Sequence, residues 1–226
     1  MKLVIFDVDG TLTNTQQIDQ KTFSTVYKTL FDFDTDDIDW TDCPDYSDTG
    51  IAHFLFQMNF GRPAGPFELR RIKSHLIDAF LNAYEQEPNQ FDEVQGASAF
   101  IEELSKNNEV KIAIATGCWE DSALFKLNVA GIDYEEIPLA HSDHAVSRID
   151  IIQKAIDLSK QQYNTTSFSD ILYFGDGEWD YKATKELNIP LIGIDANNSG
   201  KLNELGVEHI FSNYLDQARI LELLVS

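Results

Sequence analysis

A short apolar run near the start of the chain ends in two closely spaced aspartates. Residues 3–6 are apolar throughout, without the alternation of a strand that has one exposed face. A run of this kind is typical of a strand buried on both faces of a parallel sheet. Asp7 and Asp9 follow it directly, and Gly10 ends it. Because open α/β sheets bind ligands beyond the carboxyl ends of their strands, both carboxylates are predicted to lie at the site.

Buried strands and helices alternate along the second half of the chain. Continuous apolar runs predict strands at residues 110–115, 171–174 and 190–194, and a short last strand near residues 208–211. Helical patterns separate these runs, and a helix over residues 215–224 is predicted to close the chain. The alternation predicts an α/β fold with a right-handed, doubly wound parallel sheet of the Rossmann-like type.

The segment between the first strand and residue 91 has a different pattern. Helical periodicity at residues 23–31, 51–58 and 69–84 predicts three amphipathic helices. Connections in α/β units are usually only about two to six residues long, so an insertion of this length has to pack as a unit of its own. We therefore predict two domains: a catalytic α/β core of residues 1–14 and 91–226, and a smaller all-helical cap of residues 15–90.

The charge of the chain argues against nucleic-acid and membrane partners. Its 226 residues include 38 acidic and 17 basic residues, a formal net charge of -21, which would repel a polyanion. No run approaches the ~20 apolar residues of a membrane span, and the apolar start is too short for a signal peptide. Cys43 and Cys118 match neither a CxxC pair nor a disulfide framework, which favours a reducing compartment. These observations predict a cytoplasmic protein.

Polar residues also follow two of the later strands. Thr116 and Gly117 come directly after the second predicted strand, a pair that also commonly caps a helix. The run Gly-Asp-Gly-Glu-Trp-Asp follows the third predicted strand and places Asp176 and Asp180 at the turn that opens the next helix. These residues are expected to join the first two aspartates at one edge of the sheet.

Several carboxylates in one site require a cation. Asp7, Asp9 and Asp176 would lie together, and like-charge repulsion opposes that arrangement unless a cation is bound. A small, hard cation with oxygen ligands and retained waters fits such a set. The predicted cofactor is therefore Mg²⁺.

These motifs resemble those of the haloacid dehalogenase superfamily of phosphotransferases. Residues 7–13, Asp-x-Asp-Gly-Thr-Leu-Thr, are similar to the first motif of that superfamily. Thr116 with Gly117 is similar to the second motif, and residues 175–180 closely resemble the fourth. The resemblance covers the chain at residues 1–14 and about 95–226, in the order of the family's motifs, and leaves the helical cap unmatched in detail.

A basic residue completes the resemblance. In the superfamily a lysine, sometimes an arginine, projects into the site from about the position of Arg148. Lys154, further along the same predicted helix, is the alternative for this role. A guanidinium is always charged and stabilises negative charge without acting as an acid or base, so the role implied for Arg148 is electrostatic.

The resemblance implies a role for each of these residues. Asp7 attacks phosphorus and forms an aspartyl-phosphate, and Asp9 gives a proton to the leaving alcohol and later takes one from water. The implied catalytic residues are Asp7, Asp9, Thr116 and Arg148, and the implied substrate-binding residues are Thr116, Gly117 and Arg148. The implied Mg²⁺ site comprises Asp7, Asp9, Asp176 and Asp180, where Asp9 contributes its backbone carbonyl and Asp180 supports the site from slightly further back.

The resulting prediction is a Mg²⁺-dependent phosphatase that hydrolyses a small phosphorylated metabolite. Asp9 favours ester hydrolysis, because the superfamily's dehalogenases lack an acid there and a halide leaving group needs no proton. A sugar phosphomutase uses the same residues and is one alternative. A non-catalytic phosphoryl-binding or partner-binding protein is another, whereas a receiver-type signalling domain has no reason to carry the helical insertion. The sequence leaves the substrate and the oligomeric state open.

Two further polar segments allow more than one interpretation. Residues 141–144, His-Ser-Asp-His, have the composition of a metal site, but a polar loop before the next helix is the preferred interpretation. Residues 47–50, Ser-Asp-Thr-Gly, and Arg62 are candidates for substrate contact from the cap. A helix N-cap and a surface arginine explain them equally well.

Overall fold

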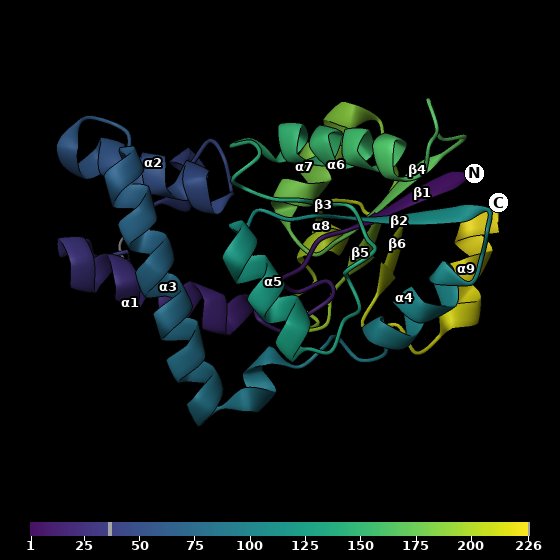
Figure 1. Ribbon diagram of the computed structural model, residues 1–226, viewed down its shortest axis with the longest axis horizontal. Helices are drawn as coiled ribbons and strands as arrows, with labels where there is room; N and C mark the ends of the chain where they lie inside the picture. The colour runs from purple at the N-terminus through teal and green to yellow at the C-terminus, as the bar shows by residue number, and fades with distance from the viewer. Residues whose placement is uncertain (36–37, 226) are drawn as a thin grey trace.

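A parallel β-sheet forms the centre of the molecule (Figure 1). The computed structural model describes residues 1–35 and 38–225. Within these residues six parallel strands lie in the order β3-β2-β1-β4-β5-β6, so the chain moves outward from a central β1 in both directions. The predicted α/β class with a doubly wound parallel sheet is confirmed. The strands are β1 (Lys2–Phe6), β2 (Val110–Ala115), β3 (Leu139–Ala140), β4 (Ile171–Gly175), β5 (Leu191–Ile194) and β6 (His209–Phe211).

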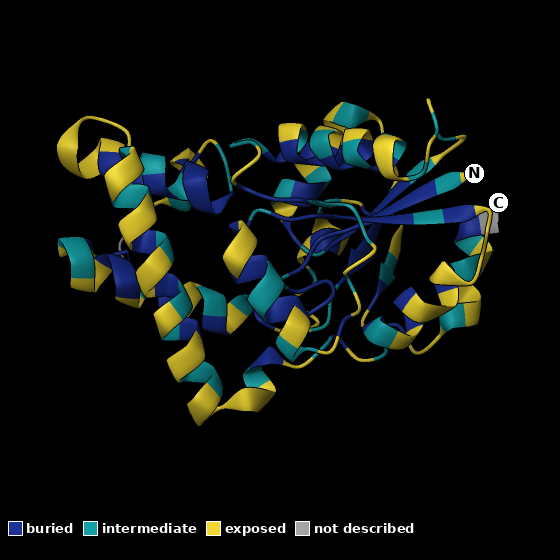
Figure 2. Ribbon diagram, viewed as in Figure 1, coloured by how far each residue is buried: buried dark blue, intermediate teal, exposed yellow. Residues whose placement is uncertain are grey.

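Alternate residues of the central strand pack on opposite faces of the sheet. Val4 and Phe6 belong to one apolar cluster, which contains α4 (Ala97–Ser105) and α9 (Gln217–Val225). Leu3 and Ile5 belong to the cluster on the other face, which contains α6 (Arg148–Gln162) and α7 (Glu178–Leu187). Figure 2 shows the strands buried along most of their length, with exposed residues on the outer sides of the helices. Burial on both faces explains why these strands lack apolar–polar alternation in the sequence.

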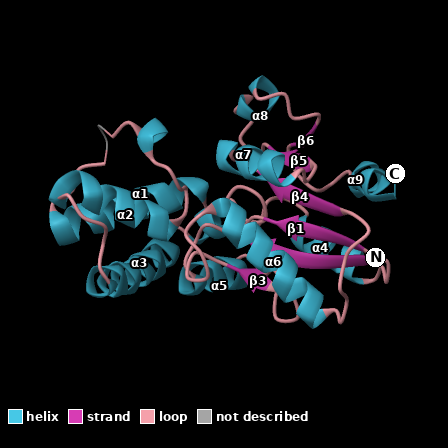
Figure 3. Cartoon of the chain, turned by 90° about the horizontal axis from the view of Figure 1, so that it is seen from above, coloured by secondary structure: helices cyan, strands magenta, loops and turns pink. Residues whose placement is uncertain are grey.

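The predicted cap segment forms a group of helices beside the sheet (Figures 1 and 3). Their apolar faces meet in a cluster that includes Leu55, Phe56 and Leu76, and Trp119 of the sheet-bearing part joins it. The cluster is what a separately packed unit requires, and the division at residues 14 and 90 stays a prediction. Its elements are α1 (Gln16–Phe31), α2 (Asp48–Phe60) and α3 (Pro66–Gln86), with 3₁₀ turns η1 (Trp40–Asp42) and η2 (Pro88–Phe91).

Local sequence signals explain the limits of α2 and α3. The Ser47 side chain accepts a hydrogen bond from the backbone N–H of Gly50 and caps α2, which ends at Gly61 in the left-handed region with φ 67°. Pro66 stands at the first position of α3, where its missing N–H is tolerated. The Glu68 side chain accepts from the N–H of Gly65 and completes the start of that helix.

Three shorter features complete the fold. Helix α5 (Glu120–Val129) follows β2 and packs between the sheet and the cap helices. The two-residue strand β3 and the one-turn helix α8 (Lys201–Glu204) are not predicted from the sequence, because so few residues carry no periodicity. No helix in the described part of the chain is long and apolar enough to cross a bilayer.

The packing of α3 predicts different effects for two of its leucines. Leu76 is buried in the cap cluster, whereas Leu81 is 45% exposed. We expect Leu76→Ala to lower the free energy of unfolding by about 2–5 kcal/mol, because it leaves a cavity. The matched change Leu81→Ala should cost about 1 kcal/mol or less. Urea unfolding followed by circular dichroism measures both, and equal losses would contradict the packing described for α3.

Candidate active site

Asp7 and Arg148 form a buried ion pair at the carboxyl end of β1. Asp7 is only 2% exposed, and its Oδ2 accepts a hydrogen bond from Nη2 of Arg148 at 2.8 Å. Arg148 is the first residue of α6, and the Ser147 side chain caps that helix by accepting from the N–H of Asp150 at 3.1 Å. The same Nη2 lies 3.3 Å from Oδ1 of Asp180. Arg148 therefore joins the end of β1 to the first turn of α7, which follows β4.

The side chains of Asp176 and Asp180 place two more carboxylates beside that of Asp7. Carboxylate oxygens of these three residues lie within 4.8 Å of one another. Asp180 is held in place, because its Oδ2 accepts from the N–H groups of Asp176 and Gly177, both at 3.2 Å. Gly10 makes the close approach of the β1 loop feasible, since it has φ 74° and a Cβ there would overlap the Asp176 carboxylate. The structure therefore brings together the first and fourth motifs.

The electrostatics of this cluster suit a cation. Burial raises the pKa of Asp7 to about 7, with Arg148 opposing the shift and Asp180 adding to it. Burial and repulsion from Asp180 raise the pKa of Asp176 well above its ordinary value. Oδ1 of Asp7 and Oδ1 of Asp176 are buried and accept no hydrogen bond from any described residue. Two unpartnered carboxylate oxygens are the ligands that a hard divalent cation requires, so the residues present fit a metal ion.

The Asp9 side chain lies in a different cluster from the Asp7 carboxylate. Its Oδ1 accepts from the Thr15 hydroxyl at 2.5 Å and lies 2.7 Å from the ammonium of Lys126. Its Oδ2 accepts from the Cys118 thiol at 2.8 Å. Burial alone would raise the pKa of Asp9, but the Lys126 ammonium and these hydrogen bonds hold it below its ordinary value. A metal contact from Asp9 would have to use the backbone carbonyl, as the resemblance implies.

Thr116 and Gly117 lie at the end of β2, beside β1. Thr116 is 1% exposed, and its hydroxyl accepts from the N–H of Cys118 at 3.2 Å. At Gly117 a Cβ would lie 3.0 Å from Nη1 of Arg148 and 2.9 Å from the carbonyl oxygen of Tyr46. The second motif is therefore packed closely against both the basic residue and the cap.

Arg148, of the two basic candidates, reaches Asp7. Lys154 lies further along α6 and is partly exposed. The Nε and Nη1 atoms of Arg148 are buried and donate no hydrogen bond to any described residue, so the guanidinium has donors to spare. Free donors beside a carboxylate are suited to binding an anionic oxygen.

The start of α2 bonds directly to the core. Ser47 Oγ donates to the carbonyl of Val146 at 2.6 Å, and the N–H of Asp48 donates to the carbonyl of Gly117 at 2.8 Å. The Asp48 carboxylate accepts from the N–H of Trp119 at 2.8 Å, and burial raises its pKa to about 8. These polar groups, which the sequence offered both as substrate contacts and as a helix N-cap, are bonded to the core in this arrangement.

Two other polar candidates also make contacts within the protein. Arg62 pairs with Glu68 at 2.6 Å beside the α2–α3 connection, and its side chain is 52% exposed. The polar loop of residues 141–144 lies between β3 and α6, as predicted. Its Asp143 bonds to Lys73 of α3 and accepts from the N–H of Glu120 at 2.9 Å, so the loop links the cap to the core.

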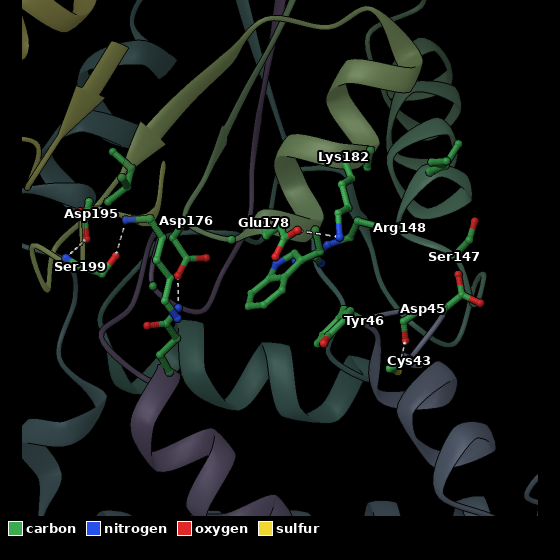
Figure 4. A pocket seen from close by; sticks show the side chains of 18 of the residues that line it. Cys43, Asp45, Tyr46, Ser147, Arg148, Asp176, Glu178, Lys182, Asp195 and Ser199 are labelled. Atoms are coloured by element: carbon green, nitrogen blue, oxygen red, sulfur yellow. Dashed lines mark hydrogen bonds and ion pairs between the residues drawn. The ribbon is translucent and has the colours of Figure 1, made fainter. Parts of the chain in front are cut away.

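A cavity of about 530 Å³ opens beside the carboxylate cluster (Figure 4). Arg148 and Asp176 line its inner end, and Gln16 of α1 bonds to the Asp176 carboxylate there. Tyr46 of the cap and Trp179 of the core stack at its wall, with ring centroids 5.3 Å apart. The cavity continues along the loop after β5 and is lined mainly by polar side chains.

The sequence analysis missed Lys126 as a residue of the site. The residue lies in α5 among Ala123, Leu127 and Ala130, which form the apolar face of that helix in the sequence. A lysine on the apolar face of a helix was the signal in the sequence. It predicts a buried ammonium, and a buried ammonium requires a carboxylate partner. Asp19, the second partner of Lys126, comes from the cap helix α1 and gives no comparable signal.

Comparison with known families assigns the chain to one of them. A model of the haloacid dehalogenase-like hydrolase family matches residues 4–194. The chain belongs to this family. The match spans the strand ends that carry Asp7, Thr116 and Asp176, together with all of the predicted cap. Among curated proteins, the sequence of this haloacid dehalogenase-like hydrolase has no significant match.

Solved structures with the same fold include other hydrolases and a mutase. A hydrolase from Pseudomonas syringae has a TM-score of 0.75 at 20% identity, over 100% of both chains. CbbY from Rhodobacter sphaeroides, in complex with phosphate, has a TM-score of 0.68 at 17% identity, over 95% of each chain. A β-phosphoglucomutase from Clostridium difficile has a TM-score of 0.69 at 16% identity, over 97% of this chain and 95% of that chain. At these identities the likeness shows the fold.

The raised pKa values predict that Mg²⁺ stabilises this haloacid dehalogenase-like hydrolase more at high pH. The pKa of Asp7 is about 7 in the fold and 3.8 ordinarily, so the folded state binds more protons. The stability that this group contributes is full below about pH 4 and is lost as the pH rises through about 7. A divalent cation bound by the ionised carboxylates would offset that loss.

Thermal unfolding with MgCl₂ and with EDTA measures this effect. We expect the increase in Tm from Mg²⁺ to be larger at about pH 8 than at about pH 5, because the carboxylates are then ionised. In Asp176→Asn most of the increase should disappear. An increase that is equal at both pH values would argue against cation binding by this cluster.

Proposed function

We propose that the protein is a Mg²⁺-dependent phosphatase that hydrolyses a small phosphorylated metabolite through an aspartyl-phosphate on Asp7. The proposal rests on the contacts that the two carboxylate oxygens of Asp7 make. Its Oδ2 is held by Arg148, while its Oδ1 is buried and accepts no hydrogen bond from any described residue. A carboxylate oriented through one oxygen and free at the other is suited to nucleophilic attack.

Side chains of this protein provide the nucleophile, the contacts to the phosphoryl group and the proton transfers of the proposed reaction. Oδ1 of Asp7 attacks phosphorus, and Arg148 with the Thr116 hydroxyl and Gly117 binds the phosphoryl oxygens. Asp9 gives a proton to the leaving alcohol and later takes one from the water that releases phosphate from Asp7. Mg²⁺, held by Asp176 and by the other carboxylate oxygen of Asp7 with support from Asp180, would supply positive charge against the phosphoryl group.

The cap has to move for substrate to reach Asp7. The nucleophile is 2% exposed, and the cap is joined to the core through residues 47–49. Closure over a bound ester excludes bulk water from the reacting atoms. A cavity of about 530 Å³ fits a small metabolite, and the phosphate bound to the structurally similar CbbY supports a phosphoryl ligand.

Phosphatase activity should depend on both Asp7 and the metal. We expect wild-type protein to release phosphate from para-nitrophenyl phosphate in MgCl₂ and to lose that activity in EDTA. Asp7→Asn should reduce turnover to background, because an amide is not a nucleophile of this kind. The exposed Asp78→Asn is a matched control that should keep full activity.

The outcomes separate phosphatase from mutase. Activity that survives Asp7→Asn would contradict the proposed nucleophile. Phosphorylation of Asp7 without release of phosphate would favour a sugar phosphomutase, which has to keep water away from the aspartyl-phosphate. The low exposure of Asp7 is compatible with that alternative. Trapping a fluoride–metal phosphate analogue at Asp7 distinguishes that outcome from a protein that only binds phosphoryl groups.

Arg148 and Lys154 should differ in their effect on turnover. Because Arg148 contacts Asp7 and has unpartnered donors, Arg148→Ala should lower kcat/KM by roughly 10²-fold or more. Lys154→Ala removes a partly exposed charge from the same helix and serves as the control. Steady-state kinetics on the aryl ester measures both, and a larger loss for Lys154→Ala would reassign the basic residue.

A further inference from the structure

Lys126 is fully buried where α5, the loop after β1 and the cap helix α1 meet. The exposure of its side chain is 0%, and its ammonium lies 2.7 Å from Oδ1 of Asp9. It also bonds to Asp19 of α1, lies 3.3 Å from Sγ of Cys118 and sits 4.9 Å from the ring centroid of Phe80. A buried ammonium is unfavourable unless it is paired, so its position is determined by these two carboxylates.

The two oxygens of Asp9 have unequal partners. Oδ1 accepts a short hydrogen bond from Thr15 and pairs with the Lys126 ammonium. Among the described residues, the hydrogen bond accepted by Oδ2 comes from the Cys118 thiol, which is a weak donor. Oδ1 is therefore anchored by a charge and a hydroxyl, whereas Oδ2 can exchange its thiol partner for another group.

We propose that Lys126 is a positioning residue for Asp9, anchoring Oδ1 so that Oδ2 is the oxygen that exchanges protons with the substrate. This role rests on the proposed phosphatase function. Oδ2 first takes the proton of the monoanionic phosphate ester, and as the phosphorus–oxygen bond breaks this proton moves from Oδ2 to the leaving oxygen. When water attacks the aspartyl-phosphate, the same Oδ2 takes the proton of the water. Lys126 acts through Asp9, without contact to the reacting atoms.

A second interpretation makes Lys126 a structural link between core and cap. Its bond to Asp19 joins α5 to α1, and loss of that bond would loosen the cap. The two roles differ in one respect. A loosened cap lowers the reactivity of every ester, whereas a misplaced Asp9 lowers the reactivity of esters whose leaving group needs a proton.

Two aryl esters of similar shape test this difference. Phenyl phosphate has a poor leaving group that depends on a proton, and para-nitrophenyl phosphate has a good one that does not. The kcat/KM values report the steps up to loss of the aryl alcohol, in which Asp9 is the acid. The proteins compared are wild type, Lys126→Met, Asp9→Asn, the double variant, and Asp19→Asn.

Unequal losses on the two esters support the positioning role. We expect Lys126→Met to lower kcat/KM for phenyl phosphate by roughly 10²-fold, and for para-nitrophenyl phosphate by less than about tenfold. Asp9→Asn should show the same pattern, and adding Lys126→Met to it should bring little further loss. Asp19→Asn keeps the pair between Lys126 and Asp9, so its effect should be similar on both esters.

Other outcomes overturn the proposal. Lys126 would be a structural link only if Lys126→Met lowered kcat/KM equally for both esters. The same conclusion would follow if the loss in the double variant equalled the product of the losses in the two single variants. If Lys126→Met does not fold, Lys126→Arg replaces it, because arginine keeps the charge but moves the hydrogen-bond donor. Its kcat/KM should again fall more for phenyl phosphate than for para-nitrophenyl phosphate, by smaller factors. Wild-type protein without Asp7-dependent turnover would instead refute the phosphatase function, so the two failures are distinguishable.

Discussion

The crowding of buried carboxylates at the carboxyl end of the sheet is the constraint on which the structure depends. A buried carboxylate without a partner costs several kcal/mol, so each must be paired, hydrogen-bonded, protonated or bound to a cation. Arg148 lies between Asp7 and Asp180, and Lys126 lies between Asp9 and Asp19. The two cations come from α6 and α5, so the positions of both helices are tied to the charges that they neutralise.

The cap is attached to the core by buried polar bonds as well as by apolar contact. Ser47 and Asp48 at the start of α2 exchange hydrogen bonds with core loops, and Trp119 is shared between both parts. Such bonds fix orientation strongly, but their net contribution is only about 1 kcal/mol each, since water replaces them on opening. An attachment of this kind combines an exact closed geometry with a modest barrier to release, as a cap over an enclosed site requires.

The sequence predicts the strand ends well and the contacts between distant segments poorly. Buried strands followed by Asp7, Thr116 and Asp176 are local patterns, and parallel pairing brings their ends together. The choice between Arg148 and Lys154 depends on which face of α6 turns toward β1, which periodicity does not settle. The contacts of Lys126 join α5, the loop after β1 and α1, which are far apart in the chain. The sequence indicates them only through a lysine on the apolar face of α5.

Asp7 and Asp9 are two residues apart, yet their surroundings shift their pKa values in opposite directions. Burial raises the pKa of Asp7 despite Arg148, while Lys126, Thr15 and Cys118 together hold the pKa of Asp9 below its ordinary value. Where two carboxyl groups divide the work of acid and nucleophile, the acid usually has the raised pKa and the nucleophile stays ionised. The order is reversed here, so Asp7 needs a bound cation to ionise fully and Asp9 needs a proton from the substrate before it acts as an acid. Both aspartates lie on the same short loop, so the separation comes from their surroundings: burial and Asp180 outweigh Arg148 at Asp7, whereas Lys126 and two hydrogen bonds outweigh burial at Asp9.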